Sequence, residues 1–257
     1  MKSSNSNRIL NLGIENYVNS FEDTYKKNLE GREPDTLYKP IIDLLERGGK
    51  RLRPSLCLMA CELVGGDIKK ALPTAICIEF FHNFSLAHDD IEDESKLRRG
   101  KPALHIKYGV PVALNAGDGL YALCYEALKD NESLLGVERA WKIFEEIAEL
   151  CVVLSEGQAM DLEFKERKEM SESKVIEMLK KKTAKLFAVS AKCGAIAGGA
   201  SYETAAELGS AWEDIGIAFQ IRDDILNVVG EEGKYGKRIG EDIAEGKPSL
   251  LLINCLE

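Results

Sequence analysis

Histidine, paired cysteine motifs and long apolar runs are scarce or missing in this chain of 257 residues. Only three histidines occur, and the seven cysteines show no C-x-x-C spacing, so no cluster of soft metal ligands is evident. No apolar run approaches the roughly 18 residues that a membrane span needs. The first residues, MKSSNSNRILNLG, also lack the apolar stretch of a signal peptide. We therefore expect a cytoplasmic protein with no membrane span and with reduced cysteines.

Basic residues are fewer than acidic ones. The chain has 34 Lys and Arg against 43 Asp and Glu, and the formal net charge of −9 argues against nucleic acid as the main partner. An acidic protein can still bind an anionic substrate where Mg²⁺ and a local group of Lys and Arg reverse the field. The hydrophobic fraction of 45% is ample for a core.

Helical periodicity runs through almost the whole chain, and no convincing alternating strand is present. Glycine pairs and Gly/Pro turns fall between the periodic segments, and no linker divides them. Residues 75–87 are almost wholly apolar, which is typical of a central helix that other helices surround. The sequence therefore predicts an all-α fold, with a single domain over 1–257 in which a bundle of long helices encloses a central cavity. The expected helices span approximately residues 8–29, 36–47, 54–64, 68–93, 110–129, 137–167, 172–198 and 203–229, with another from about 242.

Two aspartate-rich motifs lie about half a chain apart, each at the end of an apolar helical segment. The first is DDIED at residues 89–93 and the second is DDILN at residues 223–227. In a helix the first and last residues of each motif share one face, and carboxylates crowded on one face are costly unless they share a cation. Oxygen ligands without nearby Cys or His favour Mg²⁺, which often joins one or two carboxylates to substrate phosphates. One such motif could be a solvated face, but two on separate apolar helices indicate a metal-dependent site.

Two basic segments accompany these motifs. GGKRLRP at residues 48–54 puts three cations after a glycine pair at a predicted helix start, where backbone N–H groups favour phosphate. KLRRGK at residues 96–101 follows the first aspartate motif directly. It could merely neutralise the acidic helix end, but beside a magnesium site it favours binding of a diphosphate. His82 precedes Asp89 by seven residues and projects from nearly the same helix face, which favours a phosphate contact over a core role.

Taken together, these segments resemble the trans-isoprenyl diphosphate synthases of the polyprenyl synthetase family, and most of all the short-chain geranylgeranyl and farnesyl diphosphate synthases of archaeal type. The resemblance covers residues 35–250, and its segments occur in order: GGKRLRP, the His82 helix, DDIED, LRRGKPALH, GQAMD, KKTAKLF, FQIRDD and the YGK and EGK loops. Members of this family are all-α and usually homodimeric. They use Mg²⁺ to condense an allylic diphosphate with isopentenyl diphosphate.

The resemblance implies a role for each matching residue of this chain. The ligands of Mg²⁺ would be Asp89, Asp93, Asp161 and Asp223, with support from Asp90, Asp224 and Gln158. The isopentenyl diphosphate site would consist of Lys50, Arg53, His82 and Arg99. The allylic substrate would contact Arg98, Lys182, Thr183, Gln220, Lys237 and Lys247.

Bulky residues just before the first aspartate motif set the product length in this family. Here Phe84 stands five residues before Asp89, Ser85 four and Phe81 eight. An aromatic at the fifth position, with no insertion inside the motif, resembles the synthases that make a twenty-carbon product. We hypothesise that Phe81 and Phe84 both line the chain-length pocket and limit the product to geranylgeranyl diphosphate, with farnesyl diphosphate as the alternative.

Two departures from the family pattern and two rival functions remain. Asn227 replaces the final aspartate of the second motif, and the chain ends at Glu257 where family members usually continue, so we expect a domain that is short at its C-terminus.

A terpene cyclase would also use D-D-x-x-D with Mg²⁺ but would not need GGKRLRP or Arg99 for a second diphosphate. A non-catalytic regulatory subunit of a heteromeric synthase usually lacks one aspartate motif, whereas this chain keeps both.

Overall fold

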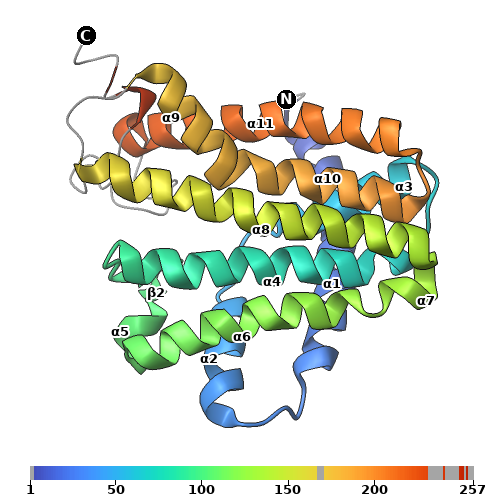
Figure 1. Cartoon of the computed structure of the whole chain (residues 1–257), viewed down its shortest axis with the longest axis horizontal. Helices are drawn as coiled ribbons and strands as arrows, with labels where there is room; N and C mark the ends of the chain where they lie inside the picture. Colours follow the sequence, from blue (N-terminus) through green and yellow to red (C-terminus); the bar gives the residue numbers. More distant parts are fainter. Residues whose placement is uncertain (1–2, 167–170, 231–239, 241–248, 252, 254–257) are drawn as a thin grey trace. The chain divides into compact units, whose positions relative to one another are not determined.

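The computed structural model describes residues 3–166, 171–230, 240, 249–251 and 253. Most of these residues lie in helices, as the sequence predicts, and they form two compact units (Figure 1). Unit 1 comprises Met1–Ile143 and Cys193–Ser201, and unit 2 comprises Phe144–Lys192 and Tyr202–Glu257. Within the described residues, no helix combines the length and the apolar character that crossing a membrane requires.

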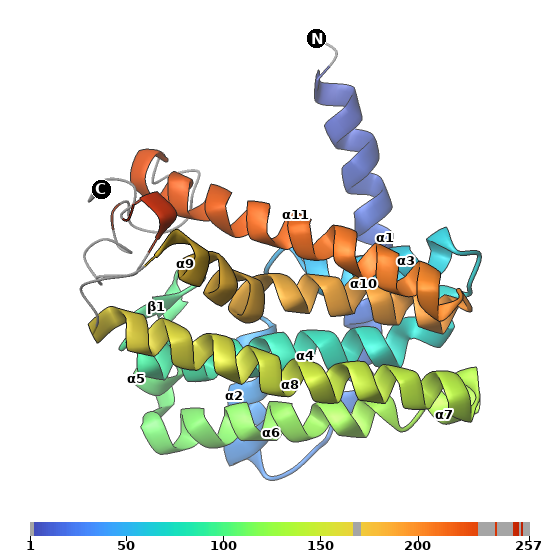
Figure 2. The same cartoon turned by 45° about the horizontal axis from the view of Figure 1, so that its top comes forward.

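Unit 1 consists mainly of helices around one central helix. Its elements are α1 (Ser3–Leu29), α2 (Asp35–Leu45), α3 (Leu52–Leu63), α4 (Ile68–Glu92), β1 (Leu97–Arg98), β2 (Lys101–Pro102), α5 (Leu104–Tyr108), α6 (Val110–Leu128) and α7 (Asn131–Leu135). Helix α4 packs against α1, α3, α6 and α7, and it lies alongside α6 in both views (Figures 1 and 2). Helices α1, α3, α6 and α7 therefore share a core with α4.

The apolar segment 75–87 forms the buried middle of α4. Ala75, Ile76, Cys77 and Ile78 are all at most 1% exposed, which confirms the prediction of a surrounded helix. Asp67 caps the N-terminus, because its side chain accepts a hydrogen bond of 3.0 Å from the backbone N–H of Lys69. The helix ends at the first aspartate motif, so the core of unit 1 fixes the position of these carboxylates.

Unit 2 has its own small core. Helices α8 (Val137–Glu166) and α10 (Lys185–Gly198) each contribute residues to both units, whereas α9 (Glu172–Leu179), the π-helical turn η1 (Lys180–Ala184) and α11 (Tyr202–Val229) belong to unit 2. The buried side chains of this core are Phe164, Val175, Met178, Leu179 and Ile253. Helix α11 packs against α9 and η1 (Figure 1).

Two local features depart from the sequence-based prediction. An antiparallel hairpin, β1–β2, occupies a stretch in which no strand was expected, because strands of two residues are too short to show alternation. The predicted helix over 172–198 is interrupted by η1, which the apolar periodicity did not reveal. Most of the helix expected from about residue 242 lies outside the described residues.

Two glycines of α10 allow a close approach to α3 within unit 1. A Cβ atom added to Gly194 would lie 2.1 Å from the carbonyl oxygen of Cys57, and one added to Gly198 would lie 2.6 Å from that of Cys61. These distances are far shorter than any normal Cβ contact, so the helices could not pack in this way with larger residues.

We expect Gly194→Ala to lower the free energy of unfolding by about 1–3 kcal/mol, because α3 and α10 would have to move apart. Chemical denaturation measures this change. The matched control is Ala122→Ser, which adds one heavy atom at an exposed position of α6 and should change the stability by less than about 0.5 kcal/mol. Equal stability of Gly194→Ala and the unmodified chain would contradict the packing argument.

Candidate functional site

The β1–β2 hairpin folds back on the first aspartate motif. Arg99 and Gly100 at its tip have φ angles of 54° and 74°, which fits the two-residue type I′ turn that matches the twist of paired strands. The turn leaves Arg98 facing α4, where its Nε and Nη2 atoms donate to Oδ1 of Asp90 over 2.8 and 2.5 Å. Asp90 is fully buried, and burial raises the pKa of its carboxyl group against the opposing hydrogen bond from Arg98. Asp90 therefore anchors the hairpin to the end of α4.

Asp89 and Asp93 are the half-exposed carboxylates of the same motif. The Oδ2 atom of Asp89 lies 3.6 Å from Nη2 of Arg98, and the backbone N–H of Asp93 donates to the carbonyl oxygen of Asp89 over 2.8 Å. The C-terminal end of a helix carries partial negative charge, so carboxylates at this position are electrostatically unfavourable. A bound cation would remove that cost.

A cation at Asp89 and Asp93 would have few protein ligands. Among the described residues, no group of three or more His, Cys, Asp or Glu side chains forms a metal cluster. Mg²⁺ fits such a site, because it commonly binds one or two carboxylates and takes its remaining oxygen ligands from water and substrate phosphates.

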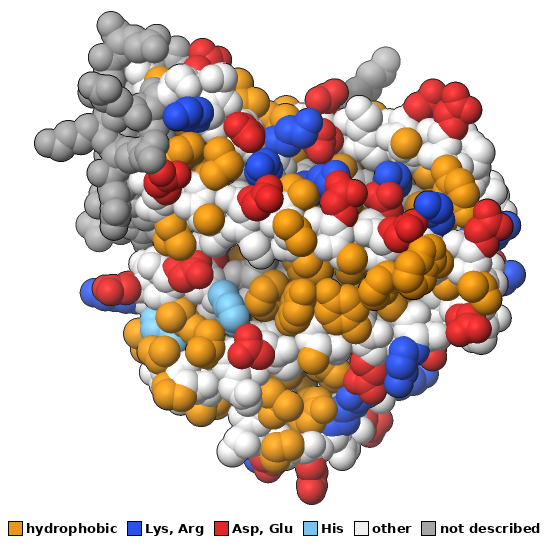
Figure 3. All heavy atoms as spheres, in the orientation of Figure 1, with side chains coloured by type: hydrophobic (Ala, Val, Ile, Leu, Met, Phe, Trp, Pro, Cys, Tyr) orange, Lys and Arg blue, Asp and Glu red, His pale blue; other side chains and the backbone are white. Residues whose placement is uncertain are grey.

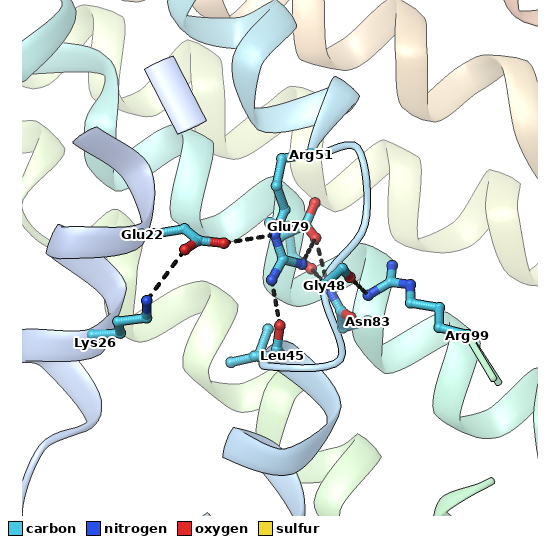
Figure 4. Close-up of polar contacts among 8 residues, drawn as sticks. All are labelled: Glu22, Lys26, Leu45, Gly48, Arg51, Glu79, Asn83 and Arg99. Atoms are coloured by element: carbon cyan, nitrogen blue, oxygen red, sulfur yellow. Dashed lines mark hydrogen bonds and ion pairs between the residues drawn. The ribbon is translucent and has the colours of Figure 1, made fainter. Parts of the chain in front are cut away.

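The two basic segments meet in unit 1. Arg99 donates a hydrogen bond from Nη1 to the carbonyl oxygen of Gly48 (Figure 4), and Nη1 of Arg53 lies 3.3 Å from Nε2 of His82. Lys50, which lies between Gly48 and Arg53 in the sequence, is exposed. Burial lowers the pKa of Arg53 to about 10, while the charge of Glu79 opposes the shift. Residues that are separate in the sequence thus form one group of cations.

The surroundings of His82 favour its neutral form. Burial, and then the charges of Arg53 and Arg99, lower its pKa well below the usual value of 6.5. A neutral imidazole carries one N–H group and one acceptor nitrogen. His82 can therefore donate one hydrogen bond to an anion without adding a further buried charge.

An aromatic cluster lies one to two turns before the aspartates. The ring centroids of Phe81 and Phe84 are 5.4 Å apart, and both rings contact Tyr121 of α6, at 6.2 and 5.0 Å. Phe81 is buried and Phe84 is half-buried. Ser85 turns its hydroxyl back to the helix, donating to the carbonyl oxygen of His82 over 2.8 Å. No sequence pattern indicates Tyr121, because its helix is remote from the first aspartate motif along the chain.

Unit 2 contains a second chain of polar contacts, which reaches the second aspartate motif. Lys182 of η1 donates from Nζ to the Oδ2 atom of buried Asp161 over 2.6 Å. The neighbouring Thr183 donates from Oγ1 to Oε1 of Gln220 over 3.3 Å, and Nε2 of Gln220 donates to Oδ1 of Asp224 over 3.0 Å. These hydrogen bonds connect the GQAMD, KKTAKLF and FQIRDD segments.

Two glycines let η1 fit between α8 and α11. A Cβ atom on Gly157 would lie 2.5 Å from the backbone nitrogen of Lys182, and one on Gly216 would lie 2.7 Å from the Cα atom of Ala184. Larger residues would push η1 away from both helices. Packing therefore requires Gly157, the single glycine of GQAMD, which its position in a polar motif does not suggest.

The other predicted site residues differ in their exposure. Asp223 is half-buried, whereas Asn227 is fully buried, and its carbonyl oxygen accepts from the backbone N–H of Gly240 over 2.7 Å. Gln158 is half-buried on α8. Lys237 and Lys247 lie outside the described residues.

Two buried polar residues were missed by the sequence reasoning. Glu79 and Asn83 lie within the apolar middle of α4, where they are 2% and 0% exposed. Their signal was available, because a carboxylate inside an almost wholly apolar segment must have a buried partner. That partner is Arg51, which was read only as one of three cations in GGKRLRP.

Three comparisons with known proteins agree on one family. The polyprenyl synthetase family model matches residues 34–257. The chain is 41% identical over 244 residues to a short chain isoprenyl diphosphate synthase of Methanothermobacter thermautotrophicus. The aligned region covers 95% of this chain and 74% of that protein. It is 43% identical over 226 residues to a geranylgeranyl diphosphate synthase of Methanosarcina mazei, with coverage of 87% and 68%.

A solved structure supports the same relationship. The geranylgeranyl pyrophosphate synthetase of Pyrococcus horikoshii is 38% identical and superimposes with a TM-score of 0.88 over 93% of this chain and 72% of that one. Sequence identity at this level over most of both chains, together with the matching fold, means that this chain belongs to the polyprenyl synthetase family.

Proposed function

We propose that this chain is an Mg²⁺-dependent prenyltransferase that condenses isopentenyl diphosphate with an allylic diphosphate. The product is a short-chain all-trans prenyl diphosphate, with geranylgeranyl diphosphate as the main one. The observation that carries this proposal is the presence of two anion-binding chemistries in unit 1. One is the cation group of Arg53, His82 and Arg99, and the other is the carboxylate pair Asp89 and Asp93.

These two chemistries suit two different diphosphates. Isopentenyl diphosphate binds to Lys50, Arg53, His82 and Arg99, because clustered cations and a neutral N–H donor recognise a diphosphate without a metal. The allylic diphosphate binds through Mg²⁺ held by Asp89 and Asp93. From the family resemblance we assign Asp161 and Asp223 as further Mg²⁺ ligands, with Asp224 in support. A terpene cyclase ionises one diphosphate only, so it would have no use for the first group.

The reaction needs charge stabilisation rather than a protein nucleophile. Mg²⁺, when bound, stabilises the negative charge that develops on the departing allylic diphosphate. Positive charge that stabilises the departing diphosphate also comes from Arg98 and Lys182. Lys237 and Lys247, which lie outside the described residues, serve the same purpose. The side-chain oxygens of Thr183 and Gln220 face the allylic cation. The double bond of isopentenyl diphosphate then attacks that cation, and the released diphosphate accepts the proton that is lost.

The oligomeric state and the domain organisation that we propose are those usual in the family. Large apolar side chains are exposed on α5 and the start of α6, where Figure 3 shows hydrophobic atoms gathered; they are Ile106, Val110 and Leu114. Exposed apolar side chains of this kind support a homodimer, in which a partner covers them. Because one family model spans both units, we also propose that they belong to a single functional domain in a cytoplasmic enzyme.

We expect the purified chain to convert isopentenyl diphosphate and an allylic primer into longer prenyl diphosphates. Product analysis with labelled isopentenyl diphosphate, Mg²⁺ and dimethylallyl, geranyl or farnesyl diphosphate measures this. EDTA should abolish turnover, excess Mg²⁺ should restore it, and light scattering of the same sample should give a dimer. A folded dimer that made no product with any primer would favour a non-catalytic regulatory subunit instead.

Loss of the metal-binding carboxylates should slow the reaction. We expect Asp89→Asn and Asp93→Asn each to lower kcat/KM for the allylic substrate by about 10²–10³, as for removal of one preorganised electrostatic contact. Steady-state kinetics at several Mg²⁺ concentrations measure the loss. The matched control is Glu94→Gln, a neighbouring exposed carboxylate, which should leave kcat/KM within about twofold of the unmodified chain. Equal losses in the control and the aspartate variants would contradict the assignment.

The aromatic cluster should limit product length. We expect Phe81→Ala and Phe84→Ala each to shift the products toward longer chains, because removing either ring opens space beside Tyr121. Product chain-length analysis measures the shift. Phe80→Ala is the matched control, since Phe80 faces Tyr25 of α1 at 6.5 Å. It should cost about 3–5 kcal/mol of stability without changing product length. An unchanged product spectrum in both cluster variants would show that these rings do not set the length.

A further inference from the structure

The loop that precedes α3 has an unusual backbone. Gly48, Gly49 and Arg51 have φ angles of 81°, 134° and 47°. Two of these residues are glycines, which adopt such conformations without strain, but Arg51 is not. A non-glycine residue in the left-handed region costs of order 1–3 kcal/mol and persists only where its surroundings hold it there. The strained residue lies between Lys50 and Arg53, which both belong to the proposed isopentenyl diphosphate site.

The side chain of Arg51 provides that hold. Its guanidinium is buried and donates from Nη1 to Oε1 of Glu79 over 2.7 Å and from Nη2 to the carbonyl oxygen of Leu45 (Figure 4). Its Nε atom also lies 3.5 Å from Oε1 of Glu22 on α1. The left-handed backbone turns this side chain into the core, away from Lys50, which is exposed. Arg51 therefore fixes the loop through contacts on its buried side.

Glu79 is held in turn by its own helix. Asn83 donates from Nδ2 to the carbonyl oxygen of Glu79 over 2.8 Å and to its Oε1 atom over 2.9 Å. One carboxylate oxygen thus accepts from both Asn83 and Arg51. Because α4 is packed on several sides, the anchor at Glu79 is rigid, and the position of Arg51 follows from it.

Glu79 also supplies negative charge to the neighbouring cations. Its charge raises the pKa of both Arg53 and Arg99, against the larger lowering that burial causes. Buried ion pairs often add little stability compared with apolar residues of the same size. A role in fixing geometry and charge explains why a carboxylate is present at this buried position.

We propose that Arg51 and Glu79 are positioning residues of the isopentenyl diphosphate site: their buried pair fixes the left-handed backbone at Arg51 and so orients Lys50 and Arg53 toward one diphosphate. This inference rests on the proposed function of the cation group. Neither residue touches the substrate. Both act through the loop, so their loss should weaken the binding of isopentenyl diphosphate and not that of the allylic substrate.

The test is direct binding of each diphosphate alone, by calorimetry, to the unmodified chain and to the variants Glu79→Gln and Arg51→Gln. The Kd for isopentenyl diphosphate should rise about ten- to a hundredfold in each variant, as when a buried charged group loses its partner. The Kd for geranyl diphosphate with Mg²⁺ should stay within about twofold, because those contacts are not made by the loop. The double variant should be no weaker than the weaker single variant, since each residue acts through the other.

Thr74→Val is the matched control. It breaks another buried polar pair of α4, in which Asn131 donates from Nδ2 to Oγ1 of Thr74 over 3.0 Å. This variant should lose stability and keep both Kd values. If Glu79→Gln fails to fold, Arg51→Lys keeps the buried charge but cannot donate to two acceptors in the same geometry, and the same selective weakening is expected of it.

Three outcomes would overturn the positioning role: unchanged binding of isopentenyl diphosphate, equal weakening of both ligands, or equal weakening in Thr74→Val. Failure of the proposed function is distinguishable from these. An unmodified chain that binds isopentenyl diphosphate but makes no product contradicts the enzymatic proposal and leaves the binding test valid. An unmodified chain that does not bind isopentenyl diphosphate contradicts both.

Discussion

The burial of α4 is the constraint on which the rest of unit 1 depends. Because α4 is packed on several sides, its buried carboxylates have little access to water and need protein partners. Glu79 is paired with Arg51, and Asp90 is paired with Arg98. Each partner belongs to a loop outside the helix. The burial of α4 therefore determines where these two loops lie, and both loops carry residues of the proposed substrate sites.

Each of the two loops supplies an arginine that compensates a buried carboxylate of α4, but the cost of burying that carboxylate differs. Asp90 is at the C-terminal end of α4, where the helix dipole disfavours a carboxylate, and Arg98 supplies the missing positive charge. Glu79 lies in the middle of the helix, where desolvation is the main cost, and Arg51 meets it from the side. In both cases the buried carboxylate pairs with one arginine. The neighbouring Arg99, Lys50 and Arg53 belong to the proposed isopentenyl diphosphate site.

The sequence predicted most of the helices, but not the local geometry of the segments that carry the candidate site residues. Apolar periodicity revealed α4 and its neighbours, because burial leaves a direct mark on residue type. The inward turn of Arg51 left no such mark, since an arginine after Gly-Gly-Lys looks like one more surface cation. The turn at Arg99 and Gly100 and the π-helical η1 depend on contacts between distant segments, which single-sequence patterns do not contain. Tyr121 was missed for the same reason.

In unit 2, close backbone packing accompanies the ion pair of Lys182 with buried Asp161. Gly157 and Gly216 bring the backbone of η1 against α8 and α11, and the wider π-turn starts at Lys180, so Lys182 reaches Asp161 from a backbone that two helices fix directly. A methyl group on either glycine would move Lys182 without altering any charge. The hydrogen bonds of Lys182 with Asp161 and of Thr183 with Gln220 therefore depend on the absence of side chains at two glycine positions, a requirement that the charged residues do not reveal.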